Sequence, residues 1–517
     1  MVNMNGAESL VKTLLNCGIE VCFTNPGTSE MHFLAALDSN PAMRSVLGLQ
    51  EGVVTGAADG YARMAGKPAC TLLHCGPGLA NGLSNLHNAR RAKSPIVNIV
   101  GDHATYHKKY NSPLTTDVEA TAKPYTDWVK TAVSSDSVSF DGAKAVAEAK
   151  KYPGKISTLV LPADISWGKA SKVATSINVA DPKLPSEKNI RRSYDALKTG
   201  KPTVIFCTGD ALMASGLEQL DRIATATGCK YLAQTSNRRI ERGFGRCNVE
   251  RLPYPTEEAT KCLEEFENII LLGTSEPAGF FAYPNKPSRL SPKESKVIEL
   301  AGPEEDVVAA LDLLLDSLGN PKSTSNVVKK FYPERPVGDL DAQNIGVALA
   351  RQIPENSIIA DESITVGRNF FSATLGAAPH DWLHITGGSI GCGMPQAVGA
   401  AIACPDRNVI NLQADGSAMY SCQSLWTQAR EDLNVVTLLF ANHAYNILQH
   451  ELKGVGVVHP GQTSIDMTTL DRPKIDWVTL AKALGVSGTR VQRAEDLDEV
   501  LADVLTKHGP YLIEVNV

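Results

Sequence analysis

The segment from residue 409 to residue 450 carries two oxygen-bearing side chains at a spacing that suits a metal ion. A run of β-branched residues ends at Asp415, and a second apolar run over 435–440 ends just before Asn442. Parallel strands deliver the residues that follow them to one edge of a sheet, so these two side chains should lie close together. One carboxylate, one amide oxygen, backbone carbonyls and phosphate oxygens together suit Mg²⁺.

The residues next to Asp415 suit a phosphate group. Gly416 lets backbone N–H groups approach an anion, and the helix expected from Ser417 onward presents its positive end there. Each residue also has a simpler interpretation, because Asp415 could cap a helix and Asn442 could occupy a turn. Either residue alone favours that simpler interpretation. The pair at this spacing favours a metal–diphosphate site.

Helices and strands must bring these residues together. Short β-branched runs, each followed by a helical stretch, recur along the chain. This rhythm predicts an α/β fold of mostly parallel sheets flanked by helices. Polar, proline-containing stretches at 181–193 and 318–344 predict two boundaries. We therefore expect three domains, at 1–180, 190–320 and 340–517, which suits a chain of 517 residues.

Composition argues against several classes of protein. There are 50 basic and 56 acidic residues, a net charge of −6, which is a poor match to nucleic acid or to an anionic membrane surface. No apolar stretch approaches the roughly 18 residues that a membrane span needs, and the first residues have the pattern of an amphipathic helix rather than a leader. The 11 cysteines show no paired spacing, which favours reduced thiols in a cytoplasmic protein.

Beyond this spacing, several segments resemble the thiamine-diphosphate enzymes. ADGS followed by ANH is similar to the GDG…NN motif of that family, and GLQEGVVTGAADGYARMAG at 48–66 is similar to a stretch of its first domain. TGGSIGCGMPQAVG at 386–399 and DESIT at 361–365 resemble two further cofactor-binding stretches. The resemblance implies a pyrimidine-binding, a central Rossmann-like and a diphosphate-binding domain. It also implies Mg²⁺ bound by Asp415, Asn442 and the backbone carbonyl of Ala444.

The resemblance assigns roles to other residues of the cofactor site. Glu51 matches the glutamate that faces N1′ of the aminopyrimidine, where a carboxyl group in an apolar cleft can share a proton with the ring nitrogen. Ile390 matches the apolar residue between the two rings of the cofactor, and the Gly388 carbonyl matches the acceptor for its 4′-amino group. Ser363 and Thr365 match hydroxyl residues that contact the diphosphate. Without the resemblance, Glu51 would only open an Ala/Gly-rich helix.

Two segments of the first domain resemble benzoylformate decarboxylase and acetolactate-synthase-like proteins, namely NPGTSE at 25–30 and the stretch 72–89. His74 matches a histidine that relays protons, and Thr28 matches a substrate-binding serine. An imidazole can give and take a proton near neutral pH, although a histidine after a strand can equally be a structural hydrogen-bonder. We expect the acceptor pocket to be formed by Thr28, His74, Phe280, Phe281 and Leu448.

The resemblance implies an enzyme that needs thiamine diphosphate and Mg²⁺ and decarboxylates a small 2-oxo acid. We expect the acyl-carbanion equivalent to pass to a carbonyl acceptor, as in acetolactate synthase; the alternative is its protonation to release an aldehyde, as in benzoylformate decarboxylase. A homodimer or homotetramer with active sites between chains is implied as well. A nucleotide-binding oxidoreductase would want a G-x-G-x-x-G turn that the chain lacks. An inactive scaffold is a third hypothesis.

Overall fold

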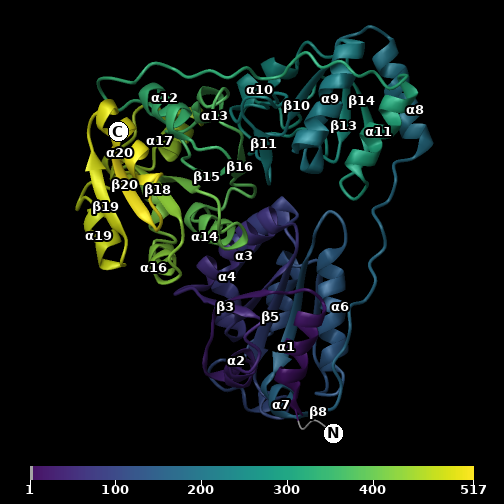
Figure 1. Cartoon of the computed structure of the whole chain (residues 1–517), viewed down its shortest axis with the longest axis vertical. Helices are drawn as coiled ribbons and strands as arrows, with labels where there is room; N and C mark the ends of the chain where they lie inside the picture. The colour runs from purple at the N-terminus through teal and green to yellow at the C-terminus, as the bar shows by residue number, and fades with distance from the viewer. Residues whose placement is uncertain (1–3) are drawn as a thin grey trace.

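The computed structural model describes residues 4–517, which form three large sheets covered by helices and one two-stranded sheet (Figure 1). The three large sheets are parallel apart from one edge strand, which confirms the predicted α/β class. None of the helices in the described part of the chain is long and apolar enough to cross a membrane. All 11 cysteines are unpaired among these residues.

The first sheet has the strand order β3-β2-β4-β5-β7-β6, and every pairing in it is parallel. A small antiparallel pair, β1 with β8, ties the start of this domain to its end. The strands are β1 (Met4–Asn5), β2 (Val21–Asn25), β3 (Arg44–Leu47), β4 (Ala69–Leu73), β5 (Ile96–Asp102), β6 (Trp128–Thr131), β7 (Ile156–Pro162) and β8 (Lys169–Ala170). The main helices are α1 (Gly6–Asn16), α2 (Met31–Asp38), α3 (Glu51–Ala65), α4 (Cys75–Ala92), α5 (Val118–Ala122), α6 (Val138–Lys150) and α7 (Ala163–Trp167).

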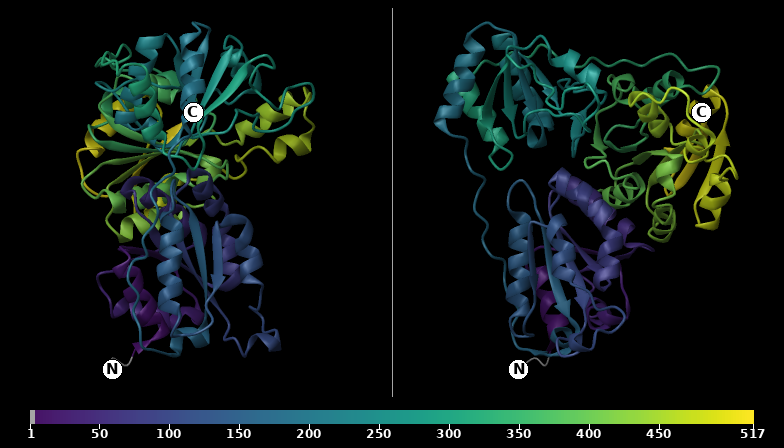
Figure 2. Two further views of the ribbon diagram at one scale, coloured as in Figure 1. Left: turned by 90° about the vertical axis from the view of Figure 1, so that its right-hand side faces the viewer. Right: turned by 180° about the vertical axis from the view of Figure 1, so that it is seen from behind.

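The second sheet has the order β12-β10-β9-β13-β14 and lies in the middle of the chain. Its strands are β9 (Thr203–Cys207), β10 (Lys230–Ala233), β12 (Glu250–Arg251), β13 (Asn268–Leu272) and β14 (Lys296–Ala301). Its helices are α8 (Glu187–Lys198), α9 (Ala214–Thr227), α10 (Thr256–Leu263) and α11 (Val307–Ser317). A long segment joins this domain to the first, and another crosses to the third (Figures 1 and 2).

The third sheet has the order β11-β16-β15-β17-β18-β20-β19. Its own strands are β15 (Ser357–Glu362), β16 (His380–His384), β17 (Val409–Ala414), β18 (Val435–Ala441), β19 (Ser487–Val491) and β20 (Tyr511–Asn516). Its helices are α12 (Ala342–Gln352), α13 (Phe370–Ala373), α14 (Gly393–Ala403), α15 (Asp415–Ala418), α16 (Gln423–Arg430), α17 (Asn446–Gly454), α18 (Gln462–Asp466), α19 (Trp477–Ala483) and α20 (Ala494–Val504).

The remaining strand, β11 (Ile240–Arg242), comes from the middle segment yet pairs antiparallel with β16. The guanidinium of Arg242 is buried against the third domain. It donates to the Thr374 hydroxyl (2.7 Å) and to the Phe371 carbonyl in α13, and lies 3.8 Å from the Phe371 ring centre. Burial and the neighbouring Arg251 lower the pKa of Arg242 to about 9, and the two hydrogen bonds and the aromatic face partly offset that cost. Hydrogen bonds of both backbone and side chain thus join the two domains.

The first and third domains meet where α3 crosses α14. Both helices present small residues, mainly Gly and Ala, at this crossing. A Cβ on Gly60 would overlap the Gln396 carbonyl, and one on Gly399 would overlap the Ala57 carbonyl, so the two backbones are in direct contact. Beside this crossing, the buried Asp59–Arg63 ion pair (2.7 Å) reaches the third domain. The AADGYAR stretch therefore joins the two domains.

The two predicted boundary stretches differ in how they fold. No helix or strand lies between α11 and α12, as the polar composition of 318–344 indicates. The stretch 181–193, however, contains the first half of α8, because the Ser186 side chain caps that helix by accepting from the Asn189 N–H. Ile190 is buried on one face of this helix. The domain bounds themselves stay predictions.

Candidate functional site

Asp415 and Asn442 meet at one edge of the third sheet, at the ends of the adjacent strands β17 and β18. The Asp415 carboxylate is 2% exposed and accepts from the N–H groups of Gly416 (2.8 Å) and His443 (2.7 Å). The Asn442 side-chain oxygen accepts from the Ala444 N–H (3.0 Å). The expected helix after Ser417 is interrupted: α15 is a single turn, and α16 begins only at Gln423.

The donor atoms at this edge fit a magnesium ion. Burial raises the pKa of Asp415, while its backbone hydrogen bonds oppose that shift. No lysine or arginine among residues 4–517 forms an ion pair with this carboxylate, so a cation would relieve its burial. The Ala444 carbonyl accepts no backbone hydrogen bond in the described chain, whereas the His443 carbonyl accepts from the Leu470 N–H. Carboxylate, amide and carbonyl oxygens are the set that Mg²⁺ prefers.

A buried carboxylate that the sequence did not single out, Glu362, fastens the neighbouring loops. It is 1% exposed and accepts from the N–H groups of Gly391 and Gly393 (both 2.6 Å), which fixes the loop containing Gly388 and Ile390. The side chain of Gln413 donates to Glu362 (3.1 Å) and to the Ser417 hydroxyl (2.7 Å). Three of the segments predicted to bind cofactor are therefore held together.

The two hydroxyl residues of the DESIT stretch follow β15 at the same edge. Ser363 is 2% exposed and donates to the Asp361 carboxylate (2.6 Å), which also accepts from the indole N–H of Trp382 (3.0 Å). Thr365 is partly buried in the loop before α13. The third domain thus gathers its share of the predicted site, from Ser363 to Ala444, around the ends of β15, β17 and β18.

Glu51 is the first residue of α3 in the first domain and is 8% exposed. Asn81 of α4 donates to its carboxylate (2.9 Å), and Gly78 leaves room for it, since a Cβ there would lie 2.9 Å from the Glu51 Oε1 atom. The same Cβ would lie 3.1 Å from the Cβ of His74. Glu51 and His74 therefore border one small space at the carboxyl end of the first sheet.

His74 is held by a second buried carboxylate that sequence reasoning missed, Glu30. The His74 Nδ1 atom lies 2.8 Å from Glu30 Oε2, and Glu30 is 3% exposed. Gly101 makes this possible, because a Cβ there would overlap the Glu30 carboxylate. Thr28, two residues earlier in the same turn, is exposed. The Nε2 atom of His74 has no hydrogen-bond partner in the described chain.

Backbone strain marks the same segments. Among residues 4–517, the non-glycine residues with positive φ are mostly Asn or Asp in turns and Lys93 at a helix end. The three others are Cys75 (φ 48°), Ile364 (φ 52°) and His443 (φ 52°). Each of these is adjacent to a predicted site residue. Strain of this kind persists where the surrounding structure holds a functional geometry.

The expected acceptor pocket is brought together only in part. Phe280 and Phe281 lie edge to face with ring centres 4.9 Å apart, and the Phe280 ring covers Gly388. Leu448 is exposed on α17, whereas Thr28 and His74 belong to the first domain. Within one described chain, no hydrogen bond or ion pair joins the Glu51–His74 group to the Asp415–Asn442 group.

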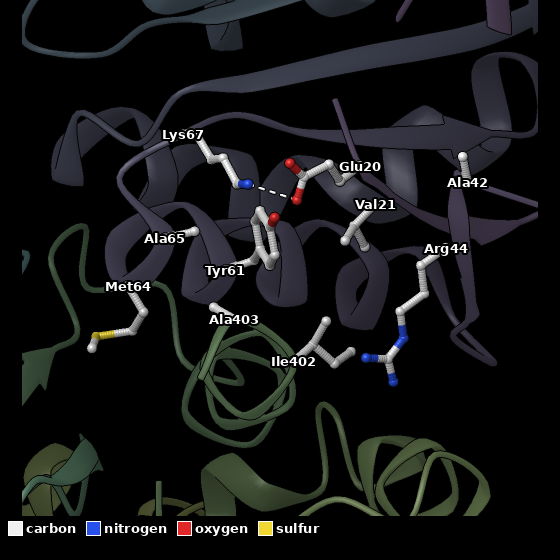
Figure 3. Close-up of a pocket in the computed structure, with 10 residues that line it drawn as sticks. All are labelled: Glu20, Val21, Ala42, Arg44, Tyr61, Met64, Ala65, Lys67, Ile402 and Ala403. Atoms are coloured by element: carbon white, nitrogen blue, oxygen red, sulfur yellow. Dashed lines mark hydrogen bonds and ion pairs between the residues drawn. The ribbon is translucent and has the colours of Figure 1, made fainter. Parts of the chain in front are cut away.

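A hollow of about 670 Å³ lies at the far ends of α3 and α14, and none of the predicted site residues lines it (Figure 3). The Lys67–Glu20 ion pair (2.6 Å) lines one side of it, with Tyr61 beside the pair. Its lining residues are Glu20, Val21, Ala42, Arg44, Tyr61, Met64, Ala65, Lys67, Ile402 and Ala403. The residues with candidate chemistry lie at the opposite ends of these helices.

Two family models match the chain. Residues 4–123 match the thiamine pyrophosphate enzyme N-terminal TPP-binding domain, and residues 369–515 match the C-terminal TPP-binding domain. These ranges contain Glu51 and His74 on one side, and Gly388, Asp415 and Asn442 on the other. The sequence resemblance to thiamine-diphosphate enzymes is confirmed.

Similarity to individual proteins extends over almost the whole chain. A Mycobacterium tuberculosis protein, provisionally named an acetolactate synthase large subunit, is 45% identical over 513 residues and 99% of both chains. Benzoylformate decarboxylase of Pseudomonas aeruginosa is 26% identical over 96% of both chains. The solved 4-hydroxybenzoylformate decarboxylase of Rhodococcus jostii shares the fold, with a TM-score of 0.86 and 24% identity over 99% of both chains. The chain therefore belongs to the thiamine-diphosphate-dependent enzymes, in the family of acetolactate synthase and benzoylformate decarboxylase.

Proposed function

We propose that this enzyme decarboxylates a 2-oxo acid and protonates the product to release an aldehyde. The observation that carries this proposal is the His74–Glu30 pair. A buried carboxylate fixes Nδ1 of the imidazole and leaves Nε2 free to give a proton near Glu51. Bound thiamine diphosphate would supply the electron sink for the carbon–carbon bond that breaks.

The chain's own residues would divide the remaining work. Glu51 would hold a proton against the aminopyrimidine ring nitrogen, and Asn81 would keep its carboxylate oriented. Asp415, Asn442 and the Ala444 carbonyl would bind Mg²⁺ and, through it, the diphosphate. Gly388 and Ile390 would position the two rings, and Ser363 and Thr365 would contact the diphosphate, as would the N–H groups at Gly416 and Ser417.

A second candidate is transfer of the same acyl-carbanion equivalent to a carbonyl acceptor. The name of the 45% identical relative favours it. Both reactions share every step through loss of CO₂, so the cofactor residues serve either outcome. The two reactions differ in what the acyl-carbanion equivalent meets after CO₂ is lost. A second carbonyl compound gives carboligation, and a proton from His74 gives the aldehyde.

The deciding experiment measures CO₂ release with thiamine diphosphate and Mg²⁺ over a panel of 2-oxo acids, with products identified by NMR. Pyruvate, branched-chain acids and benzoylformate make up the panel. Free aldehyde from a bulky acid supports the decarboxylase. Acetolactate from pyruvate would support the carboligase. If the cofactor-loaded enzyme released no CO₂ from any acid, both proposals would be refuted.

A further inference from the structure

Three side chains with different metal-binding atoms lie together at the carboxyl end of the first sheet. A Glu30 carboxylate oxygen, a ring nitrogen of His74 and the Cys75 Sγ atom all lie within 4.8 Å of one another. In residues 4–517, no other three His, Cys, Asp or Glu side chains bring their ligand atoms so close together. Glu30 and His74 belong to the proton donor proposed above, whereas Cys75 has no part in it.

The distances within this group are close to those of a tetrahedral zinc site. Bonds of about 2.0–2.3 Å from zinc to oxygen, nitrogen and sulfur place the ligand atoms roughly 3.4–3.6 Å apart. In the structure, His74 Nδ1 lies 2.8 Å from Glu30 Oε2, and Cys75 Sγ lies 3.9 Å from Glu30 Oε1. Side-chain movements of about 1 Å would therefore bring all three ligands to bonding distance.

The Ser29 hydroxyl occupies the centre of the group. Its oxygen lies 2.5 Å from Glu30 Oε1, 3.2 Å from His74 Nδ1 and 3.1 Å from Cys75 Sγ. An atom that contacts all three ligands stands where a bound ion would stand. Because Ser29 is only partly buried, rotation about its Cα–Cβ bond can move the hydroxyl aside and admit an ion.

Two glycines leave room around the ligand atoms. A Cβ on Gly27 would overlap the His74 imidazole, and one on Gly101 would overlap the Glu30 carboxylate. Cys75 joins the group from a left-handed backbone conformation (φ 48°) at the start of α4. The His74 side chain is 21% exposed and that of Glu30 is 2% exposed. An ion can therefore enter past the imidazole and bind among buried ligands.

The charge and the chemistry of these ligands favour zinc over magnesium. Burial raises the pKa of Cys75 to about 11, and the Glu30 and Asp102 charges add to that shift, so the thiol keeps its proton until a cation displaces it. One Zn²⁺, one carboxylate and one thiolate sum to zero charge, which suits a buried site. Sulfur and nitrogen ligands favour Zn²⁺, whereas the oxygen ligands proposed at Asp415 and Asn442 favour Mg²⁺.

We propose that Glu30, His74 and Cys75 form a regulatory Zn²⁺ site, and that bound zinc stops the release of aldehyde. The proposal rests on the proton donation by His74 proposed above and adds its regulation. An imidazole that binds a metal must be neutral, so zinc on Nδ1 prevents the doubly protonated form that gives a proton from Nε2. The Cys75 thiol proton passes to solvent as the Zn–S bond forms. Removal of zinc by a chelator restores the His74–Glu30 pair.

A cobalt titration tests metal binding without any turnover. Co²⁺ accepts the same ligands as Zn²⁺, and a thiolate bound to it gives a charge-transfer absorption in the near ultraviolet. Enzyme loaded with thiamine diphosphate and excess Mg²⁺ should gain this absorption with equimolar Co²⁺, and Zn²⁺ should remove it. Cys75→Ala should abolish the absorption, and Glu30→Gln should weaken cobalt binding by about tenfold or more. Cys207→Ala, which removes a comparably buried thiol from β9, is the matched control.

Turnover of an active 2-oxo acid from the panel above tests the regulatory effect. With Mg²⁺ in excess, Zn²⁺ should lower kcat of the wild type and of Cys207→Ala by about a hundredfold, the usual contribution of a positioned proton donor, and a chelator should restore it. Cys75→Ala should keep a normal kcat and resist zinc. Equal zinc inhibition of Cys75→Ala and the wild type would mean that zinc acts elsewhere, and would overturn the proposal.

The two measurements separate this proposal from the decarboxylation on which it rests. If the wild type gains no thiolate absorption, the zinc site is wrong while decarboxylation stands. If no acid releases CO₂, decarboxylation fails, and the cobalt titration still decides whether these residues bind a metal. If zinc binds at Cys75 and turnover continues unchanged, the regulatory effect and the role of His74 as proton donor are both refuted.

Discussion

At the scale of single residues, carboxylates do most of the positioning, and they differ in what surrounds them. Glu51 accepts from one amide group, Asp415 only from backbone N–H groups, and Glu30 faces an imidazole. Glu362 fastens a loop through two backbone N–H groups. The same side-chain chemistry thus serves four purposes because each carboxylate meets a different set of donors.

Glu51→Gln should leave thiamine diphosphate binding nearly intact and reduce kcat by about a hundredfold or more, because the amide cannot share a proton with the ring nitrogen. Cofactor affinity from fluorescence quenching and kcat from CO₂ release would be measured together. Glu187→Gln, an exposed first helical residue, is the control and should behave like the wild type. Full activity in the Glu51→Gln enzyme would contradict the assigned role.

Asp415→Asn tests how burial affects the carboxylate that we propose as a metal ligand. Because burial raises the pKa of Asp415 in the folded state, its ionisation costs stability, and this cost appears as pH rises through the raised pKa. The cofactor-free wild type should therefore lose stability relative to Asp415→Asn in urea titrations as the pH rises above the ordinary aspartate pKa of about 3.9. Mg²⁺ with thiamine diphosphate should stabilise only the wild type. A pH-independent difference would argue against this account.

Glu51 and Asp415 could be proposed as site residues from the sequence, whereas Glu30 and Glu362 could not. Asp415 follows a strand at a spacing from Asn442 that indicates a metal site, whereas Glu51 was proposed because its stretch resembles the thiamine-diphosphate enzymes. Glu30 acquires its role only when β4 brings His74 to it, and Glu362 only when the 387–393 loop folds over it. The one available signal was that Glu30 lies in the NPGTSE stretch next to Thr28.

At the scale of elements, the apolar runs predicted strands well, and polar strands were missed. The runs ending at Asn25, Asp102 and Ala441 are all strands of parallel sheets. The strand β16, HDWLH, has no apolar run or alternation, yet it is fully buried. Its Asp381 is paired with Arg239 (2.8 Å) and Arg407, and burial lowers the pKa of His380 to about 3, which keeps that imidazole neutral.

The crossing of α3 and α14 gives a prediction at this scale. A methyl group on Gly399 would overlap the Ala57 carbonyl and lie 2.5 Å from the Tyr61 nitrogen, so Gly399→Ala should push the helices apart. We expect a loss of about 3 kcal/mol in the free energy of unfolding. Gly461→Ala is the control, with φ −73° and no atom within 4 Å of the new methyl group. Equal denaturation midpoints for the two variants would refute the close contact.

At the scale of the whole molecule, the predicted site residues lie in two separate groups, one in the first domain and one in the third. In one described chain their side chains share no hydrogen bond, and several apolar residues near Asp415 are exposed, among them Met419, Tyr420 and Leu448. We propose that a second copy completes the site, in a homodimer or a tetramer of two such pairs.

Co-expression of Glu51→Gln and Asp415→Asn chains tests this arrangement. With sites between chains, one of the two sites in each mixed pair receives an intact Glu51 and an intact Asp415. Random pairing makes half of the pairs mixed, so about a quarter of wild-type specific activity should return. Each variant alone is the control and should be nearly inactive. If the mixture stays as inactive as its parts, each site is complete within one chain.

The antiparallel pairing of β11 with β16 determines which fragments of this protein can fold on their own. A fragment cut at the linker before α12 would carry the third sheet with β16 as a bare edge, and bare edges recruit foreign strands. Such a fragment should precipitate. A fragment to which residues 238–243 are joined by a flexible linker should instead pair this segment with β16 and stay in solution. For protein engineers, the module that can be exchanged between relatives is therefore the middle and third domains together.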